Sequence, residues 1–418
     1  MKHNVLWMVL ILSVILLLSM TLTTQASAQG EQALWAFKGG QSDGANPFGR
    51  PIFDSAGNLY GTTLAGGNTY WAGSVYQLTP SNGGWTETMI YSFSGSTDGA
   101  QPEAGLVIDD AGNFYGTTAG GGLFSKGTVF ELSPSGGGWT QKVIHSFTGG
   151  VDGATPYLGS LTFDRAGNLW GTTNSGGQYN AGTVFKLAHT KGGWREKVIY
   201  AFAGGNDAQW PNESLVFDPK EKTIYGASYQ GGGSGCGGYG CGTVFQLTHT
   251  ATGWQEQVLY AFTGGPDGGQ PYESVILDSA GNLYGTTFAG GDANGDGVVF
   301  ELVRSENSWT EQVLYTFKGK KDGANPYVNV TFGKDGALYG ATDQEGAYKN
   351  GVLFKLTPKK NGTWKQTVLY AFTGGTDGGL PLSGLTFDDA GDIFGVTVQG
   401  GDDNVCSYGC GAIYEYTP

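Results

Sequence analysis

Short apolar and aromatic segments alternate with turn residues along the chain, and none repeats its apolar positions with the period of a helix. The stretch from 274 to 317 shows the pattern. Apolar segments at 274–278, 283–287, 297–302 and 309–317 are separated by a Ser-Ala-Gly-Asn turn, a glycine-rich loop and a polar link. Many positions on both strand faces are apolar. The pattern therefore predicts four short antiparallel strands in a sheet that packs between two others.

This four-stranded unit recurs along the chain. The motif D-G-x-x-P marks it, with the aspartate at Asp43, Asp98, Asp152, Asp207, Asp267, Asp322 and Asp377. Successive motifs lie 55, 54, 55, 60, 55 and 55 residues apart. Such a fixed period indicates a repeat architecture, and four antiparallel strands per repeat are typical of a propeller blade.

The two ends of the chain complement each other. The seventh copy stops at Pro418, before its fourth strand, whereas residues 31–37 (EQALWAF) match the fourth-strand sequence of residues 256–262 (EQVLYAF). We therefore predict an all-β fold: a seven-bladed β-propeller with four antiparallel strands per blade, in which residues 31–37 complete the last blade and close the ring. The alternative, an open β-solenoid, would leave unpaired edges that need capping units.

The N-terminus has the features of an export signal. Lys2 precedes the apolar stretch Val5 to Met20, and Ala26-Ser27-Ala28 forms a small-residue cleavage site. We expect residues 1–28 to be a signal peptide and residues 29–418 the propeller, in a secreted or periplasmic protein. The alternative is an uncleaved membrane anchor. No other stretch is apolar enough to span a bilayer, so we expect no membrane span in the mature chain.

Composition narrows the range of partners. The formal net charge is −14, and 76 of the 418 residues are Gly. Phosphate binding needs patches of Lys and Arg, and no such patch is visible in the sequence, so nucleic acid is not expected as a partner. Net negative charge on a secreted protein favours solubility. We also expect a monomer.

The core D-x-x-G-N-L-Y-G-T-T…G-G…G-T-V-F occurs at 54–63, 109–130 and 164–185. With these motifs the chain resembles the GloVer-type tandem-repeat family of secreted bacterial proteins, over essentially all of residues 31–418. The resemblance implies export and a propeller-like repeat, but no established activity and no catalytic residue. It also implies a C-terminal surface anchor in many members, from which this chain departs by ending at Pro418.

Two connections per blade are expected to meet at one end of the central channel. The second residue after the motif proline varies among Gly49, Ala104, Leu158, Glu213, Glu273, Val328 and Ser383. Glu213 and Glu273 fall in neighbouring blades and are candidates for the acid and base of a glycoside hydrolase. The alternative is that both are solvated side chains at the channel mouth. His145, His189 and His249 do not converge with a nucleophile, which argues against a Ser-His-Asp hydrolase.

Aromatic residues also concentrate at this end. Phe48, Tyr157, Tyr272 and Tyr327 directly follow the motif proline, and Trp210 precedes it. Further aromatics occupy the other loop set, namely Tyr70, Trp71, Phe124, Tyr179, Tyr239, Tyr348 and Tyr408. Aromatic rings stack on sugar faces while polar groups orient the hydroxyls. We predict a ligand site formed by Arg50, Glu103, Tyr157, Trp210, Tyr272, Tyr327, Asn329 and Trp71. The alternative is packing between blades, which we expect for Trp85, Trp139, Trp194, Trp254, Trp309 and Trp364.

Two loops carry possible structural chemistry. Asp292, Asn294 and Asp296 form the D-x-N-x-D-G start of a calcium loop, but Val303 stands where the final glutamate ligand would be. The alternative to bound Ca²⁺ is an ordinary turn, and no other cofactor is predicted. Export favours disulfides, and local pairing would join Cys236 to Cys241 and Cys406 to Cys410. A four-cysteine zinc site is the alternative.

From these observations we predict a secreted, non-catalytic propeller that binds an extracellular glycan or cell-wall polymer on its loop-rich end. A carbohydrate-active hydrolase that uses Glu213 and Glu273 is the second interpretation. A protein-interaction scaffold is the third.

Overall fold

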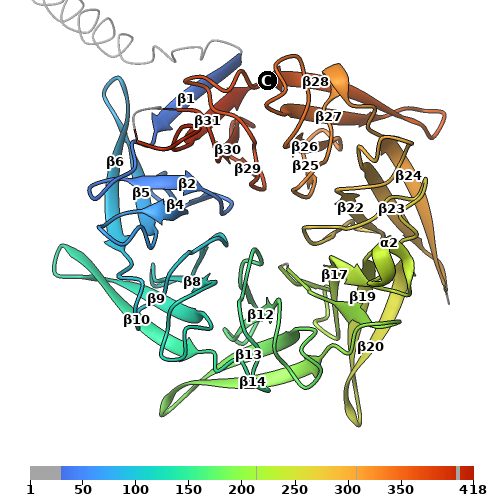
Figure 1. Cartoon of the computed structure of the whole chain (residues 1–418), viewed down its shortest axis with the longest axis horizontal. Helices are drawn as coiled ribbons and strands as arrows, with labels where there is room; N and C mark the ends of the chain where they lie inside the picture. Colours follow the sequence, from blue (N-terminus) through green and yellow to red (C-terminus); the bar gives the residue numbers. More distant parts are fainter. Residues whose placement is uncertain (1–29, 213, 307, 402–404) are drawn as a thin grey trace, which may run out of the picture.

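The computed structural model describes residues 30–418 except 213, 307 and 402–404, so the predicted signal peptide and Glu213 lie outside the described residues. Four-stranded antiparallel sheets follow one another around a ring (Figure 1). Seven sheets form blades one to seven in chain order, and blade one carries one additional short strand, β2 (Gly44–Pro47), beside β4 (Leu59–Gly66). This arrangement confirms the predicted fold class. Within the described part of the chain, no helix is long and apolar enough to cross a membrane.

The strands of each blade run from the channel outwards. Blade one comprises β3 (Ile52–Phe53), β4 (Leu59–Gly66), β5 (Ser74–Ser81) and β6 (Gly84–Ser92). Blade two comprises β7 (Val107–Ile108), β8 (Phe114–Thr118), β9 (Thr128–Ser135) and β10 (Gly138–Ser146). Blade three comprises β11 (Thr162–Phe163), β12 (Leu169–Thr173), β13 (Thr183–Thr190) and β14 (Gly193–Ala201). Blades four and five comprise β16 (Val216–Phe217), β17 (Thr223–Ser228), β19 (Thr243–Thr250) and β20 (Gly253–Ala261); and β21 (Ile276–Leu277), β22 (Leu283–Thr287), β23 (Val298–Arg304) and β24 (Trp309–Thr316).

Blade six comprises β25 (Thr331–Phe332), β26 (Leu338–Thr342), β27 (Val352–Pro358) and β28 (Trp364–Ala371). Blade seven comprises β29 (Thr386–Phe387), β30 (Ile393–Thr397), β31 (Ala412–Thr417) and the N-terminal β1 (Gly30–Ala36). The remaining short elements lie in connections: β2 (Gly44–Pro47), β15 (Ala208–Gln209), β18 (Gln230–Gly231), the helical turn α2 (Gly235–Gly238) and the 3-10 turn η1 (Lys320–Asp322).

The ring closes as the sequence predicts. Strand β1 pairs antiparallel with β31, from Gly30 opposite Thr417 to Ala36 opposite Ala412, and Figure 1 shows the two strands side by side. Leu34 is buried in the core between blades seven and one. The first strand of the propeller therefore completes the blade formed by the last residues of the chain.

The core consists of layers between blades. One layer, for example, packs Tyr115 and Val129 of blade two against Leu169 and Phe185 of blade three. The repeated outer-strand tryptophans belong to these layers. The ring of Trp194 lies 5.7 Å from that of Tyr115 in the preceding blade, which is the packing role predicted for this position.

The aspartate of D-G-x-x-P fixes the end of an outer strand. The Asp98 carboxylate accepts hydrogen bonds from the Tyr91 hydroxyl at 3.0 Å and the Ser94 backbone N–H at 2.8 Å. Equivalent bonds join Asp267 to Tyr260 and Thr263. The motif that identifies the repeat is therefore a clamp between one blade and the chain that enters the next.

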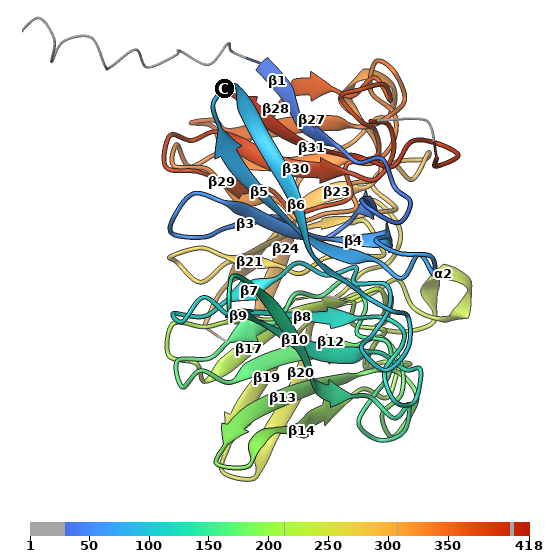
Figure 2. The ribbon, with the colours of Figure 1, turned by 90° about the vertical axis from the view of Figure 1, so that its left-hand side faces the viewer.

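Two kinds of connection share one face of the ring, which we call the loop face. The first kind is the connection that enters each blade, at 37–51, 93–106, 147–161, 202–215, 262–275, 317–330 and 372–385. The second kind is the loop between the second and third strands, at 64–73, 119–127, 174–182, 229–242, 288–297, 343–351 and 398–411. Backbone hydrogen bonds such as Gln101 N–H to the Ala72 carbonyl, 2.8 Å, join them. Figure 2 shows α2 projecting on this side. The opposite side, with the tight hairpin turns, is the turn face.

Candidate functional site

The centre of the loop face is occupied by half-buried aromatic side chains, which we call the central cluster: Phe48, Tyr157, Tyr229, Tyr272, Phe288 and Tyr327. Tyr272 and Tyr327 stack with ring centroids 4.3 Å apart and planes 22° apart. Tyr157, which enters from blade three, interacts through its hydroxyl with Tyr327 of blade six. Side chains from opposite sides of the ring therefore meet and cover the channel.

Three members of this cluster, Phe48, Tyr229 and Phe288, were not in the predicted site, and the last two belong to the other loop set. Tyr229 lies 4.6 Å from Tyr272, and Phe288 lies 5.2 Å from it, between ring centroids. Tyr229 and Phe288 are each the first residue after the second strand of their blade. The sequence carries a signal for this position, because the residue type there varies between blades while the preceding strand is nearly constant. In blade six the equivalent residue is Asp343.

Two buried carboxyls adjoin the central cluster. Burial raises the pKa of Glu103 to about 7, although the Tyr157 hydroxyl interacts with it and lowers that pKa. Burial likewise raises the pKa of Asp343 to about 7. Both acids therefore carry less negative charge near neutral pH than their formal charge implies. The centre of the loop face is better suited to neutral polar groups than its composition alone indicates.

A small cavity lies beneath the cluster. Arg50, Glu103, Glu273 and Tyr327 contribute to the lining of a cavity of about 20 Å³, which has room for about one water. The Asn329 backbone N–H donates to Glu273 at 2.9 Å, and Arg50 Nε donates to the Thr386 hydroxyl at 3.1 Å. Burial raises the pKa of Glu273, while the Asn329 bond and the charge of Arg50 oppose that shift. This cavity is too small for a sugar ring.

The remaining predicted ligand residues lie elsewhere. Trp210 is half-buried in the connection entering blade four, where its backbone N–H donates to the Ala181 carbonyl at 3.0 Å. Trp71 is 40% exposed in the second loop set of blade one. The structure thus brings Tyr157, Tyr272 and Tyr327 together with Glu103, and it places Trp71 apart from them.

Exposed aromatic residues occupy one repeated position around the loop face. A glycine precedes each third strand, and the third residue before this glycine is Tyr70, Phe124, Tyr179, Tyr239, Asn294, Tyr348 or Tyr408. The six aromatic side chains are 53% to 77% exposed. We call these six residues the aromatic rim. Blade five has Asn294 instead.

Five of the six rim residues, all except Tyr239, occupy a tight turn. In blade three the Asn180 N–H donates to the Gly177 carbonyl at 3.3 Å, so that Tyr179 is the third residue of a four-residue turn. Equivalent bonds join Ser125 to Gly122 and Lys349 to Gly346. Such turns favour Asn, Asp, Ser and Gly for local backbone reasons, and Asn294 fits this preference. The turn itself does not require an aromatic ring.

The predicted calcium loop is the blade-five version of this turn. The Asp292 carboxylate accepts the backbone N–H of Asn294 at 2.8 Å and of Gly295 at 3.2 Å. The Asn294 amide donates to Asp296 at 3.4 Å. No group of three or more His, Cys, Asp or Glu side chains in the described chain is placed to hold a metal ion. The Ca²⁺ site stays a prediction.

The four cysteines form the two predicted local disulfides, Cys236–Cys241 and Cys406–Cys410. No free cysteine is found in the part of the chain that the structure describes, so the zinc alternative does not apply. Both disulfides lie in loops that carry a rim residue, Tyr239 and Tyr408. They restrain the two loops and are consistent with an oxidising compartment.

Solved structures with a similar fold are remote in sequence. A protein described as a 6-phosphogluconolactonase from Bacteroides uniformis is 15% identical with a TM-score of 0.49, over 76% of this chain and 83% of that one. One described as a glucose dehydrogenase-type oxidoreductase from Thermus thermophilus is 15% identical with a TM-score of 0.46, over 82% and 99%. PorZ of Porphyromonas gingivalis, described as a surface component of the type-IX secretion system, is 15% identical with a TM-score of 0.49, over 89% of this chain and 46% of its own. These likenesses carry no functional argument.

Sequence comparison is informative at the level of the family. A search of curated protein sequences found no match. The Gloeobacter/Verrucomicrobia repeat, in contrast, matches residues 19–240 and again residues 236–418, which together include every blade. This agrees with the GloVer-type resemblance of the repeated motifs, and the chain belongs to the Gloeobacter/Verrucomicrobia repeat family.

Proposed function

We propose that this protein is an exported, non-catalytic propeller that binds an extracellular glycan or cell-wall polymer on its loop face. The observation that carries the proposal is the aromatic rim. Six of seven equivalent positions expose an aromatic ring, although the turn that holds five of these rings favours small polar residues. Isolated exposed apolar side chains need no explanation, but a repeated set on one face indicates an interaction surface.

A glycan matches the chemistry of this face. Tyrosine rings stack on the apolar faces of sugars, and their hydroxyls hydrogen-bond to the rim of the sugar. The chain has a formal net charge of −14, which disfavours a polyanion on this face. Several rings on one rigid scaffold can engage a repeating polymer at once, and such multivalent binding raises avidity far above the affinity of one site. We therefore propose a neutral, repeating glycan as the ligand.

The small cavity beside Glu273 supports binding without cleavage. Glu273 adjoins a cavity of about 20 Å³, too small for a glycosidic substrate, and a hydrolase needs two carboxyls that flank the scissile bond. Export is supported by the two disulfides and by the signal-like composition of residues 1–28.

Retention of the purified protein on insoluble cellulose, chitin, xylan and peptidoglycan tests the proposal, with release of reducing ends recorded in parallel. The informative variant changes all six rim residues to Asn, the residue that blade five already carries there. Loss of one stacked ring is expected to weaken retention about 2- to 10-fold, and the six-site variant should lose it. Val151→Asn is the matched control, because Val151 is equally exposed on the loop face but lies outside the rim.

Retention that survives in the six-site variant would contradict the rim as the binding surface. Failure of the wild-type protein to bind any of the four polymers would contradict the proposed glycan binding. The interpretation as a protein-interaction scaffold would then remain. Cleavage of a polymer would contradict the non-catalytic part of the proposal.

A further inference from the structure

A groove of about 780 Å³ opens on the turn face between blades three and four. Its blade-three wall includes Trp170 on β12, Lys186 on β13, and Arg195 and Lys197 on β14. Alternate residues of a strand share one face, so Arg195 and Lys197 both belong to this wall. Trp254 and the turn containing Lys222 contribute the blade-four wall. The volume lies within the range of small-molecule sites.

The groove is built from departures from the repeat. Trp170 replaces the tyrosine or phenylalanine of the other six blades at this position, and its ring lies 5.4 Å from that of Trp254. The first turn of blade four is one residue longer than that of blade three. Asp218 N–H bonds to Thr223 in the longer turn, whereas Asp164 N–H bonds to Asn168. Two independent changes therefore meet at one place.

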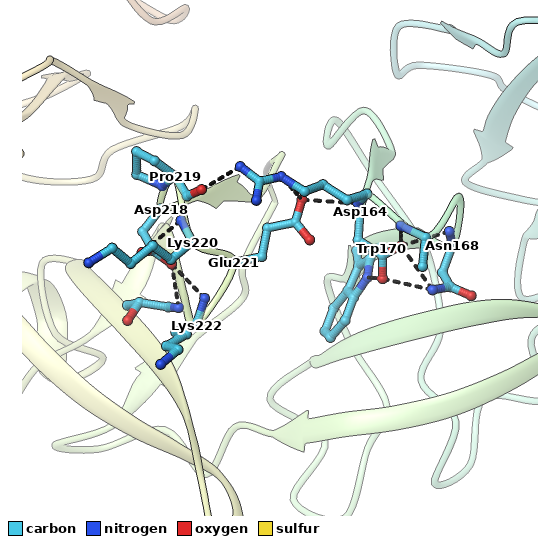
Figure 3. A network of polar contacts seen from close by, with 11 residues as sticks. Asp164, Asn168, Trp170, Asp218, Pro219, Lys220, Glu221 and Lys222 are labelled. Carbon is cyan, nitrogen blue, oxygen red and sulfur yellow. Dashed lines mark hydrogen bonds and ion pairs between the residues drawn. The ribbon is translucent and has the colours of Figure 1, made fainter.

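The longer turn is tied to the neighbouring blade (Figure 3). A guanidinium nitrogen of Arg165 donates to the Pro219 carbonyl at 2.5 Å, and the Arg165 backbone N–H donates to Glu221 at 3.0 Å. The Arg165 Nε also lies 3.6 Å from the Glu221 carboxylate. This bridge links the two turns at the edge of the groove.

The acidic groups of the groove are already engaged. The Asp164 carboxylate accepts hydrogen bonds from Trp170 at 2.9 Å, from Asn168 and from Lys186 at 3.0 Å. Burial alone would raise the pKa of Asp164, but these bonds lower it to about 2. Glu221 is engaged by Arg165. Neither carboxylate is available to neutralise the remaining cations.

The cations of Arg195, Lys197 and Lys222 have no hydrogen-bond or ion-pair partner among the described residues, and all three side chains are exposed. The equivalent grooves differ. The groove between blades seven and one is lined by Asp54, Asp388, Asp389 and Glu415, without a cation. That between blades two and three includes Asp109, Asp110, Glu131 and Asp164, and its one arginine, Arg165, is engaged by Pro219 and Glu221. Only the groove between blades three and four, among those compared, offers unpaired positive charge beside aromatic rings.

We propose that this groove binds an acidic sugar, with its carboxylate or other anionic group at Arg195, Lys197 and Lys222 and its ring against Trp254. Aromatic walls suit a sugar ring, and Arg is a bidentate partner for a carboxylate. The net negative charge of the protein repels long polyanions, so the ligand is a short acidic oligosaccharide or a single charged unit. This inference is independent of the glycan-binding surface on the loop face.

The test measures binding of trigalacturonate and of uncharged galactotriose to the full protein by calorimetry at 50 and 500 mM NaCl, with inorganic phosphate as a further arm. The informative variant is Arg195→Gln/Lys197→Gln. Blade four carries Gln255 and Gln257 at these positions on the equivalent strand, so the change is compatible with the fold. Lys365→Gln on the corresponding strand of blade six is the matched control.

We expect trigalacturonate to bind at least about tenfold more tightly than galactotriose, with an affinity that falls as salt rises. The affinity of the double variant for trigalacturonate should fall about tenfold or more. The affinities of Lys365→Gln and of the six-site rim variant should stay within about twofold of the wild-type value. Equal affinity for the charged and uncharged trisaccharides, no binding of trigalacturonate, or an unchanged affinity in the double variant would overturn the proposal. Phosphate binding as tight as that of trigalacturonate would contradict recognition of a sugar and would indicate a simple anion site.

Discussion

The side-chain amide of Gln141 donates a hydrogen bond to the backbone carbonyl of Asp98 at 3.1 Å. Gln366 makes the equivalent bond to Asp322 at 3.3 Å. Each bond joins an outer strand to the clamp that ends the outer strand of the preceding blade. The contact is therefore part of the interface between neighbouring blades.

The other five blades have glutamate at this position: Glu31, Glu87, Glu196, Glu256 and Glu311. The Oε1 atom of each is buried with no hydrogen-bond partner among the described residues. A neutral carboxylic acid has an O–H where glutamine has an N–H. We infer that these five side chains are protonated in the folded protein at mildly acidic pH and then reproduce the glutamine contact.

The surroundings agree with this inference. Burial, followed by the charge of the nearby aspartate, raises the pKa of Glu87 and of Glu256 to about 8. The same two causes raise the pKa of Glu196 and of Glu311 to about 7. Glu31 also reaches about 7, despite an opposing interaction with Tyr370.

Stability should consequently fall as the solution becomes alkaline. A carboxyl with a higher pKa in the folded protein binds its proton more tightly there than in the unfolded chain. Its contribution to folding stability is therefore fully present below the unfolded-state pKa near 4.5. The contribution is lost as the pH rises towards the folded-state pKa of 7 to 8. We expect the midpoint of urea unfolding to be clearly higher at pH 5 than at pH 8.5. A midpoint that rises between these values would contradict protonated glutamates.

Substitution separates this effect from other titrations. Glu87→Gln and Glu256→Gln should each raise the free energy of unfolding at pH 8.5 by about 1–2 kcal/mol and change it little at pH 5. Gln141→Glu should do the reverse, because it installs the titrating group in a blade that lacks it. Urea titrations of the three variants at both pH values check this. Equal effects at the two pH values would indicate a packing change instead.

A close contact between neighbouring strands explains the glycine of each second strand. A Cβ on Gly171 would lie 2.6 Å from Cζ of Phe185 on the adjacent strand. Gly171→Ala should lower the free energy of unfolding by about 1–3 kcal/mol through overpacking. Gly138→Ala is the control, because a Cβ there would meet only a carbonyl oxygen at 3.9 Å. Similar unfolding midpoints for the two variants would show that the core accommodates the added methyl group and would contradict overpacking.

The N-terminal strand should contribute to the stability of the whole ring. Leu34 is buried between blades seven and one, whereas Gln32 on the same strand is exposed. Leu34→Ala is expected to cost about 2–4 kcal/mol of unfolding free energy, and Gln32→Ala less than about 0.5 kcal/mol. Thermal and urea unfolding of the two variants provide the comparison. If Leu34→Ala matched Gln32→Ala, β1 would not be an integral strand of blade seven.

The ring was predictable from the sequence, because the spacing of Asp43 to Asp377 gives the number of blades and residues 31–37 identify the missing strand. The environment of individual aromatics was not. Tyr272 and Tyr70 are the same residue type in loops of the same face, yet Tyr272 stacks on Tyr327 and Tyr70 is 77% exposed. Only the folded turns decide which rings pack together and which remain available to a ligand.

The groove between blades three and four shows a second limit. Arg195 and Lys197 lie on β14, and Lys222 lies in a turn of the next blade. Charge counts along the sequence do not bring these residues together, because the contact depends on how consecutive blades pack. Their departure from the repeat, Arg-Glu-Lys at 195–197 where blade four has Gln-Glu-Gln at 255–257, was nevertheless visible.

Protection of the rim tyrosines from chemical nitration by a bound glycan tests the central claim most directly. Tyr70, Tyr179, Tyr239, Tyr348 and Tyr408 are all more than half exposed and should be nitrated rapidly in the free protein, as read by peptide mass spectrometry. With a saturating amount of the polysaccharide that retains the protein, we expect their nitration to slow several-fold, while a polysaccharide that does not retain it has no effect. Unchanged nitration of these five tyrosines in the bound protein would place the glycan elsewhere and contradict the account.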